Sequence, residues 1–176
     1  MRIIFNDNHA RSIRNYLASI KRKNHRAICQ KHPISVIIEN QNGDIIDGWN
    51  GAPYNIYHPR ECSRKEHRIG GEMNACIGID AEQRAISRAL NAKMSLEGGV
   101  IYMSEWFPCL NSAKLIIDVG IEGIITPDEI YSNKRKTHLI DDLRNKSYNF
   151  ELAESLIREA GIDIVIDPRI GQEYKK

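Results

Sequence analysis

Apolar side chains recur at helical spacing near the start of the chain and then gather in two short runs. Over residues 8–23 they return every three or four positions, which predicts an amphipathic helix with one buried face. Two runs rich in β-branched residues follow at 35–39 and 45–49, and they flank an Asn-Gly pair at 42–43. Asn-Gly between apolar runs is typical of a hairpin turn, so we expect two antiparallel strands.

From residue 79 onward, helical and extended patterns alternate along the chain. The helical patterns cover 79–92, 111–119 and 148–160, and the extended ones cover 99–103, 123–125 and 162–166. Residues 50–75 are rich in Gly, Pro, Asn, His and charge, which predicts a long functional loop. A hairpin followed by alternating helices and strands indicates an α/β fold with one mixed sheet of about five strands, flanked by helices.

Length and composition indicate an ordinary globular protein. A chain of 176 residues suits one core, so we expect 1–176 to be a single domain. Apolar residues make up 41% and charged residues 27%, as in typical soluble proteins. The chain has no apolar run near the roughly eighteen residues that span a bilayer, and its N-terminus lacks the order of a secretion signal. We therefore expect a cytoplasmic protein without a membrane partner.

Positive charge is concentrated near the N-terminus, although the formal net charge is only +2. The stretch 10–32 has no Asp or Glu, and its basic residues are Arg11, Arg14, Lys21, Arg22, Lys23, Arg26 and Lys31. Such a run either attracts phosphate or forms a solvated helix face, which is the commoner role. It lacks the interleaved aromatic residues of a single-strand path, so the sequence argues against a nucleic-acid partner.

Three short segments stand out, and the last two begin predicted helices. Residues 48–53 read G-W-N-G-A-P, residues 80–86 read D-A-E-Q-R-A-I, and residues 108–117 read P-C-L-N-S-A-K-L-I-I. In order and spacing they resemble the G-Y-N-G-x-P, H-A-E-x-N-A-I and P-C-x-x-C-A-K-x-I-I motifs of the cytidine/deoxycytidylate (CMP/dCMP) deaminase family. The resemblance extends over about residues 10–166.

This resemblance implies a three-layer α/β/α cytidine-deaminase-like fold and hydrolytic deamination of a cytosine (deoxy)nucleotide to the uracil nucleotide. In such enzymes three ligands hold a zinc ion that activates water. A glutamate that does not bind the metal transfers protons, and Glu82 matches it. Asp80, Cys109 and Ser112 occupy the ligand positions. The resemblance also implies a homo-oligomer and a pyrimidine nucleotide bound near Ala81.

The ligand positions depart from the family pattern in a way that affects zinc. Asp80 stands in place of histidine, and Ser112 stands in place of the second cysteine. Aspartate can bind zinc through oxygen, whereas a serine hydroxyl must first lose a proton of high pKa. We therefore expect zinc, the family cofactor, to bind weakly. Two functions stay open: a zinc-dependent hydrolase of the dCMP deaminase type, or a pseudoenzyme that binds pyrimidine nucleotides or a partner deaminase.

Three further positions each allow more than one interpretation. By resemblance Asn50 contacts the sugar of a nucleotide, or else it is a turn residue beside Gly51. Arg84 replaces the family's asparagine one helical turn after Asp80, so it pairs with Asp80, reaches a phosphate, or lies at the surface. Trp106 either stacks on a base or packs in the core.

Four cysteines occur, and none forms a paired C-x-x-C motif. In a cytosolic chain, metal binding or catalysis is a better interpretation than disulfides. Some deoxycytidylate deaminases carry a second, structural zinc. Resemblance to them implies a structural metal site built from Cys29, Cys62, Cys76 and His67, and the alternative is free buried cysteine.

Overall fold

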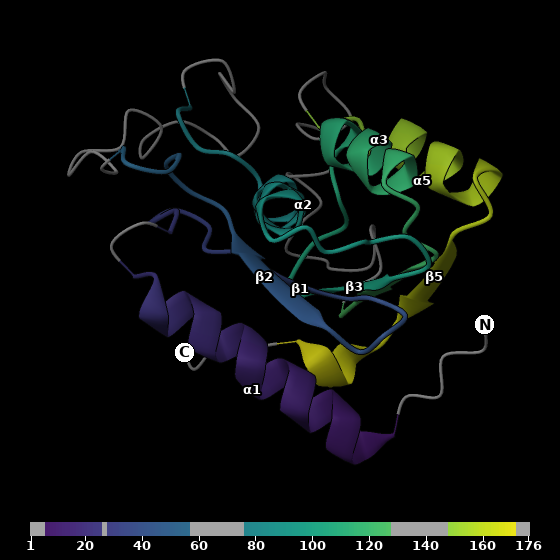
Figure 1. Ribbon diagram of the computed structural model, residues 1–176, viewed down its shortest axis with the longest axis horizontal. Coiled ribbons are helices and arrows are strands. Elements are labelled where there is room, and N and C mark those ends of the chain that lie inside the picture. The colour runs from purple at the N-terminus through teal and green to yellow at the C-terminus, as the bar shows by residue number, and fades with distance from the viewer. Residues whose placement is uncertain (1–5, 26–27, 57–75, 128–147, 172–176) are drawn as a thin grey trace.

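Five strands form one mixed sheet in the order β2-β1-β3-β4-β5. The computed structural model describes residues 6–25, 28–56, 76–127 and 148–171, and the statements below refer to these residues. The strands are β1 (Ser35–Glu39), β2 (Ile45–Trp49), β3 (Val100–Met103), β4 (Gly123–Thr126) and β5 (Asp163–Ile166). β1 pairs antiparallel with β2 and β3, whereas β3, β4 and β5 run parallel (Figure 1). The predicted α/β class with a mixed five-stranded sheet is confirmed.

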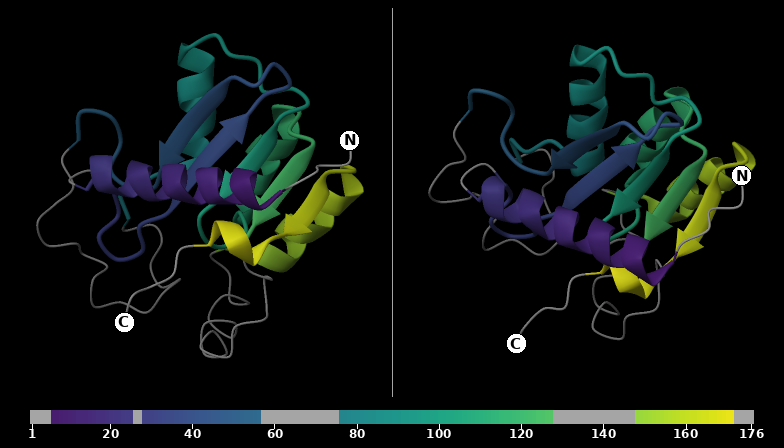
Figure 2. Two further views of the ribbon diagram at one scale, coloured as in Figure 1. Left: turned by 90° about the horizontal axis from the view of Figure 1, so that it is seen from below. Right: turned by 60° about the horizontal axis from the view of Figure 1, so that its bottom comes forward.

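Helices cover both faces of this sheet and complete three layers. The helices are α1 (Asp7–Lys23), α2 (Ala81–Asn91), α3 (Leu110–Asp118), α5 (Phe150–Glu159) and the short 3-10 turn η3 (Pro168–Ile170). α1 and η3 lie on one face, and α2, α3 and α5 lie on the other (Figure 1). α1 runs across the strands from the side opposite α2 (Figure 2). None of the described helices is long and apolar enough to cross a membrane.

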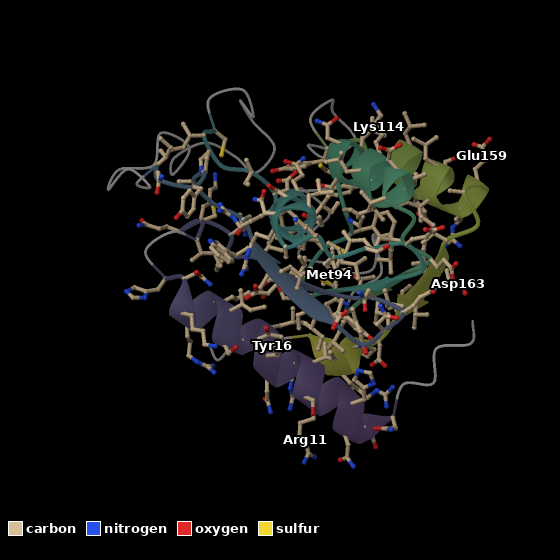
Figure 3. The ribbon with its side chains drawn as sticks, viewed as in Figure 1. Arg11, Tyr16, Met94, Lys114, Glu159 and Asp163 are labelled. Atoms are coloured by element: carbon tan, nitrogen blue, oxygen red, sulfur yellow. The ribbon has the colours of Figure 1, made fainter. Side chains whose placement is uncertain are left out.

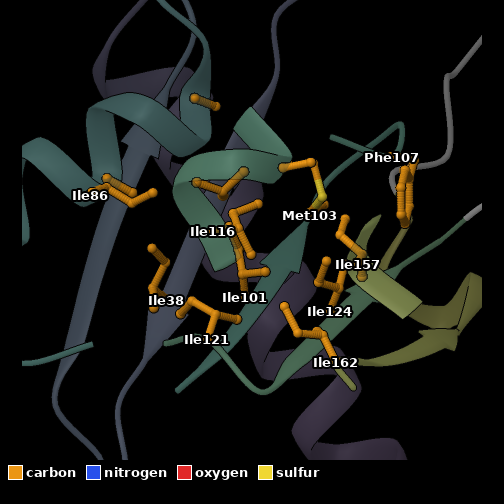
Figure 4. Close-up of a cluster of buried hydrophobic side chains, with 14 of the residues drawn as sticks. Ile38, Ile86, Ile101, Met103, Phe107, Ile116, Ile121, Ile124, Ile157 and Ile162 are labelled. Carbon is orange, nitrogen blue, oxygen red and sulfur yellow. The ribbon is translucent and has the colours of Figure 1, made fainter. Parts of the chain in front are cut away.

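Successive side chains along the strands point to opposite faces of the sheet, and this divides the core into two parts. Val36 and Ile38 pack with α2, α3 and α5, whereas Ile37 between them packs with α1. Successive side chains of a strand point to opposite faces, so a strand that is apolar throughout serves both layers. The larger part surrounds Ile101 and Ile124 (Figure 4). Both parts share the one sheet, while the assignment of 1–176 as a single domain stays a prediction.

The periodicity of α1 matches its burial. Its buried residues are Ala10, Ile13, Leu17 and Ile20. The side chain of Asn6 accepts a hydrogen bond from the His9 amide at 2.9 Å and caps the helix start. Arg11 points away from the sheet, and Tyr16 lies between α1 and the sheet (Figure 3). At least part of the basic stretch therefore faces outward.

α2 begins two residues later than the pattern predicted. Ile79 exchanges two backbone hydrogen bonds with Gly51, at 3.1 and 2.9 Å, and this pairing keeps Ile79 extended. The helix consequently starts at Ala81, with Asp80 as its N-cap. This later start places Asp80 at the N-cap and Glu82 in the first turn of α2.

Candidate active site

Helices α2 and α3 begin close together, and each is preceded by a candidate metal ligand. Asp80 is the N-cap of α2, and Cys109 is the N-cap of α3. Neither side chain makes a hydrogen bond that caps its own helix. Both side chains are therefore available for contacts across the gap between the two helix starts.

The three residues at the predicted ligand positions meet at one carboxylate oxygen. The Cys109 thiol and the Ser112 hydroxyl each donate to Oδ2 of Asp80, and both distances are 3.2 Å. The Cys109 sulfur lies 3.7 Å from the Ser112 oxygen. Ser112 is fully buried one turn into α3. The structure thus brings the three side chains together as a compact hydrogen-bonded network.

The chemistry of this donor set does not fit a catalytic zinc ion. Such a site needs three good ligands, mainly histidine nitrogen, thiolate or carboxylate. Here burial and the charge of Asp80 raise the pKa of the Cys109 thiol to about 12, which opposes thiolate formation. The Ser112 hydroxyl is a poor ligand because it holds its proton even more tightly. Within the described ranges, no group of three or more His, Cys, Asp or Glu is arranged to hold a metal.

Glu82 lies beside this network and is almost completely buried. Burial is the main reason why the pKa of its carboxyl rises from 4.5 to about 8, and the charge of Asp80 adds to the rise. Its own backbone amide opposes the shift. Glu82 therefore holds a proton near neutral pH and can donate it to a bound molecule.

Asp80, Glu82 and Cys109 line a narrow cleft with a wall of aromatic residues. The other lining residues are Ile34, Asn50, Ala81, Met103, Trp106, Phe107, Tyr148 and Phe150. The cleft opens to solvent and holds a cavity volume of about 30 Å³, enough for water.

Trp106 stands in this wall in an unusual backbone conformation. Its φ is +46°, a left-handed value that costs a non-glycine residue about 1–3 kcal/mol. Its ring lies 5.1 Å from the ring of His32 and meets Tyr148 edge-on at 6.4 Å. Tyr148 in turn stacks on Phe150 at 5.4 Å. Trp106 is thus at the cleft, as expected, and it also packs against other aromatic rings.

Tyr148 and Phe150 also line this site, and sequence reasoning missed both of them. They lie outside all the motifs, at the start of a predicted helix. In the structure, Tyr148 precedes α5 and its carbonyl accepts from the Leu110 amide at 2.8 Å, which ties it to the start of α3. The pattern that could have indicated them is a pair of aromatic residues on either side of a helix N-cap, and this pattern is recognisable only once the structure is known.

Asn50 lines the cleft, and its amide group already has backbone partners. Its Oδ1 accepts from the Ile34 amide at 2.8 Å, and its Nδ2 donates to the His32 carbonyl at 2.7 Å. The side-chain oxygen of Asn50 keeps one further acceptor site, and the side-chain nitrogen keeps one further donor. Contact with a sugar stays a prediction, while the structure assigns Asn50 a role in holding the 32–34 segment.

Arg84 is buried, and its partners differ from those expected from the sequence. Its guanidinium donates to the carbonyls of Trp49, Gly51 and Ala52, at 2.7, 3.0 and 2.5 Å. It also lies 4.8 Å from the centre of the Trp49 ring, a cation–π contact. Arg84 is not among the residues that line the cleft. It therefore braces the end of β2 and the residues that follow it, instead of pairing with Asp80 or lying at the surface.

The possible structural metal site falls only partly within the described residues. Cys29 and Cys76 are free, half-buried thiols, and the Cys76 sulfur accepts a hydrogen bond from the Gly78 amide at 3.4 Å. Cys62 and His67 lie outside the described residues. The second metal site stays a prediction.

Comparison with known proteins identifies relatives of this chain. The model of the family described as "Cytidine and deoxycytidylate deaminase zinc-binding region" matches residues 10–127. An uncharacterized deaminase in the luxG 3' region of Aliivibrio fischeri is 24% identical over 131 residues, which are 74% of this chain and 76% of that protein.

Solved structures with the same fold share little sequence with this chain. The dCMP deaminase of cyanophage S-TIM5 in its apo form has a TM-score of 0.62 at 15% identity, covering 92% of this chain and 99% of the other. A diaminohydroxyphosphoribosylaminopyrimidine deaminase/5-amino-6-(5-phosphoribosylamino)uracil reductase from Thermotoga maritima has a TM-score of 0.54 at 16% identity. That match covers 93% of this chain and 37% of the other. These likenesses concern the fold.

Proposed function

Because this chain belongs to the family of cytidine and deoxycytidylate deaminases, we propose that it binds a pyrimidine nucleotide without catalysing zinc-dependent hydrolysis. The observation that carries this proposal is the network in which Asp80 accepts hydrogen bonds from Cys109 and Ser112. Oδ2 of Asp80 satisfies both donors, so the three side chains at the family's ligand positions are already engaged with one another. The chain is then a catalytically inactive deaminase homologue.

The walls of the cleft support a nucleotide as the ligand. Trp106, Tyr148 and Phe150 offer aromatic faces on which a base can stack. The protonated carboxyl of Glu82 offers a hydrogen-bond donor at the cleft. The cyanophage dCMP deaminase, with the same fold, has also been solved in complex with dCMP and dUMP. We take dCMP as the first ligand to test.

Restoring the family's ligands tests the loss of zinc. We would purify the wild type and the Asp80→His/Ser112→Cys variant from zinc-supplemented medium and measure zinc per chain by mass spectrometry. We expect far less than one zinc in the wild type and about one in the variant, since His/Cys/Cys is a good zinc set. About one zinc in the wild type that disappears in Cys109→Ala would contradict the proposal.

Calorimetric titration with dCMP tests the binding half of the proposal on the wild type. Heat of binding to dCMP without release of ammonia is the expected result. Binding of neither dCMP nor dUMP would overturn it.

Hydrolytic deamination of a cytosine nucleotide is the second candidate, and Glu82 favours it. A buried carboxyl with a pKa near 8 is well matched to proton transfer near neutral pH. Ammonia release from dCMP by the wild type, abolished in Glu82→Ala, would establish this activity. A homo-oligomer also remains our proposal from family resemblance, and light scattering on the purified chain tests it.

A further inference from the structure

We propose that Lys21 is a positioning residue for the cleft, because its ion pair with Glu105 holds the backbone that presents Trp106. Lys21 lies on α1, on the face of the sheet opposite α2 and α3. The inference rests on the proposed function in one respect: the molecule that stacks on Trp106 is taken to be a nucleotide.

The ion pair is short and well shielded. Lys21 Nζ lies 2.7 Å from Glu105 Oε1, and the two side chains are 13% and 11% exposed. Exposed ion pairs fix little, because two long side chains lose freedom for a weak attraction in water. In a shielded pair, removal of one partner is costly because the other charge stays away from water, so the pair constrains the geometry.

The residue before Glu105 is tied to the same helix by a second route. Ser104 and Ser35 form two hydrogen bonds, from the Ser104 amide to the Ser35 carbonyl at 2.9 Å and from the Ser35 amide to Ser104 Oγ at 3.0 Å. The Ser35 hydroxyl then donates to the Leu17 carbonyl on α1 at 2.9 Å. Leu17 lies one helical turn before Lys21. Ser104 and Glu105, the two residues before Trp106, are therefore anchored to adjacent turns of α1.

The left-handed backbone of Trp106 explains why such anchoring is needed. A non-glycine residue keeps a positive φ only where the surrounding structure overrides its preference. Trp106 follows directly after Glu105, so the Lys21–Glu105 pair constrains the peptide on its N-terminal side. Without the pair, the backbone at Trp106 is free to relax, and the ring leaves the wall of the cleft.

Tryptophan fluorescence tests the position of Trp106 without any ligand. The chain has two tryptophans, so a Trp49→Phe background leaves Trp106 as the reporter. In this background we would compare acrylamide quenching in Lys21→Met, Glu105→Gln and the double variant. The matched control is Lys23→Met, which removes an exposed lysine from the same helix. We expect quenching to rise toward that of the unfolded chain in the first three and to stay unchanged in the control.

The double variant separates positioning from simple loss of stability. Lys21→Met/Glu105→Gln removes both charges of the pair, so we expect it to fold with a native circular dichroism spectrum. Its quenching still rises if the ion pair positions Trp106. Unchanged quenching in the folded double variant would overturn the inference, whether or not the protein binds nucleotides.

A double-mutant cycle on dCMP affinity connects the pair to the cleft. We expect Lys21→Met/Glu105→Gln to weaken dCMP binding about tenfold, which corresponds to roughly 1.4 kcal/mol. In a Trp106→Gly background the same change should have little effect, because the ring is absent and glycine adopts a positive φ without cost. An equal loss of affinity in both backgrounds would show that Lys21 does not act through Trp106. If the wild type binds no dCMP, the proposed function fails, and the quenching experiment alone decides this inference.

Discussion

At the scale of single residues, the carboxylate of Asp80 governs the protonation of its neighbours. It accepts hydrogen bonds from Cys109 and Ser112, and its charge contributes to the raised pKa values of both Cys109 and Glu82. Both neighbours consequently favour their neutral forms near neutral pH. A cleft lined by the carboxylate of Asp80 and by two protonated groups, those of Glu82 and Cys109, suits hydrogen bonding to a ligand better than metal binding.

The raised pKa of Glu82 makes the stability of the protein depend on pH. Because the folded state raises this pKa from 4.5 to about 8, folding favours the protonated form, and stability falls as pH rises through this window. Glu82→Gln removes the titration. We would measure the free energy of unfolding in urea at pH 5, 6, 7 and 8. The free energy of the variant should rise relative to that of the wild type by roughly 1 kcal/mol per pH unit. Parallel pH profiles of the two proteins would contradict the burial of an ionisable Glu82.

Arg84 is expected to matter for stability far more than a surface arginine. Arg84→Met leaves the carbonyls of Trp49 and Ala52 without their donor and removes one of two donors from the Gly51 carbonyl, which should cost about 2–4 kcal/mol in the free energy of unfolding. The control is Arg158→Met, since Arg158 makes an exposed pair with Glu154 on α5 and should cost under about 0.5 kcal/mol. Equal losses in urea unfolding would argue against the bracing role.

At the scale of elements, close packing between β2 and α2 sets the position of the acidic helix start. A Cβ atom at Gly48 would come 2.2 Å from the Ala81 carbonyl oxygen and 2.8 Å from the Ala85 Cβ. Only glycine allows the strand to approach the first turns of α2 this closely. The position of Asp80 and Glu82 therefore depends on a residue of the neighbouring strand.

We expect Gly48→Ala to push α2 away from β2 and to destabilise the protein by about 2–3 kcal/mol. Gly78→Ala is the matched control, since its Cβ would meet atoms at ordinary contact distances of 3.4 Å or more. Thermal or urea unfolding of the two variants provides the comparison. A Gly48→Ala protein as stable as Gly78→Ala would show that the helix shifts without cost.

At the scale of the whole molecule, one sheet separates two apolar layers and supports both. The central strand β3 pairs on both sides, while β2 and β5 are the edges. Ile101 at the centre is fully buried, and Ile45 and Ile166 on the edge strands are 45% and 47% exposed. Global unfolding is thus needed to expose the centre of the sheet, while the edges can open locally.

Native-state hydrogen exchange should follow this arrangement. Hydrogen-bonded amides of β3 and β4 should exchange most slowly and with the free energy of global unfolding, whereas amides of β2 and β5 should exchange faster. Mass spectrometry of peptic fragments is sufficient to compare the strands. Equal protection of central and edge strands would point to a partner that covers the edges.

Much of this architecture could be predicted because burial repeats with the period of each element. The face of α1 at Ile13, Leu17 and Ile20 follows helical spacing, and Asn42-Gly43 marks the hairpin between β1 and β2. The convergence of Asp80, Cys109 and Ser112 was expected because their motifs resemble a known family. In each case the information is local or comes from a motif.

Contacts between distant segments were not predictable from this sequence. Arg84 was placed on the right turn of α2, yet its burial depends on three carbonyls at and after the end of β2 that no pattern reveals. Tyr148 enters the cleft only because the starts of α3 and α5 lie together. The Lys21–Glu105 pair joins residues far apart in the chain, and charge patterning does not specify such partners.

The oxygen shared by Cys109 and Ser112 has an evolutionary consequence, since it makes a path from this sequence to a His/Cys/Cys ligand set depend on the order of steps. Changing Asp80 to histidine first replaces an oxygen that accepts from both side chains by an imidazole that can accept only one hydrogen bond, and the donor left unpaired costs about 1–3 kcal/mol. Changing Ser112 to cysteine first keeps that acceptor and replaces one donor by another. A lineage or laboratory selection that acquires this ligand set should therefore pass through Ser112→Cys before Asp80→His.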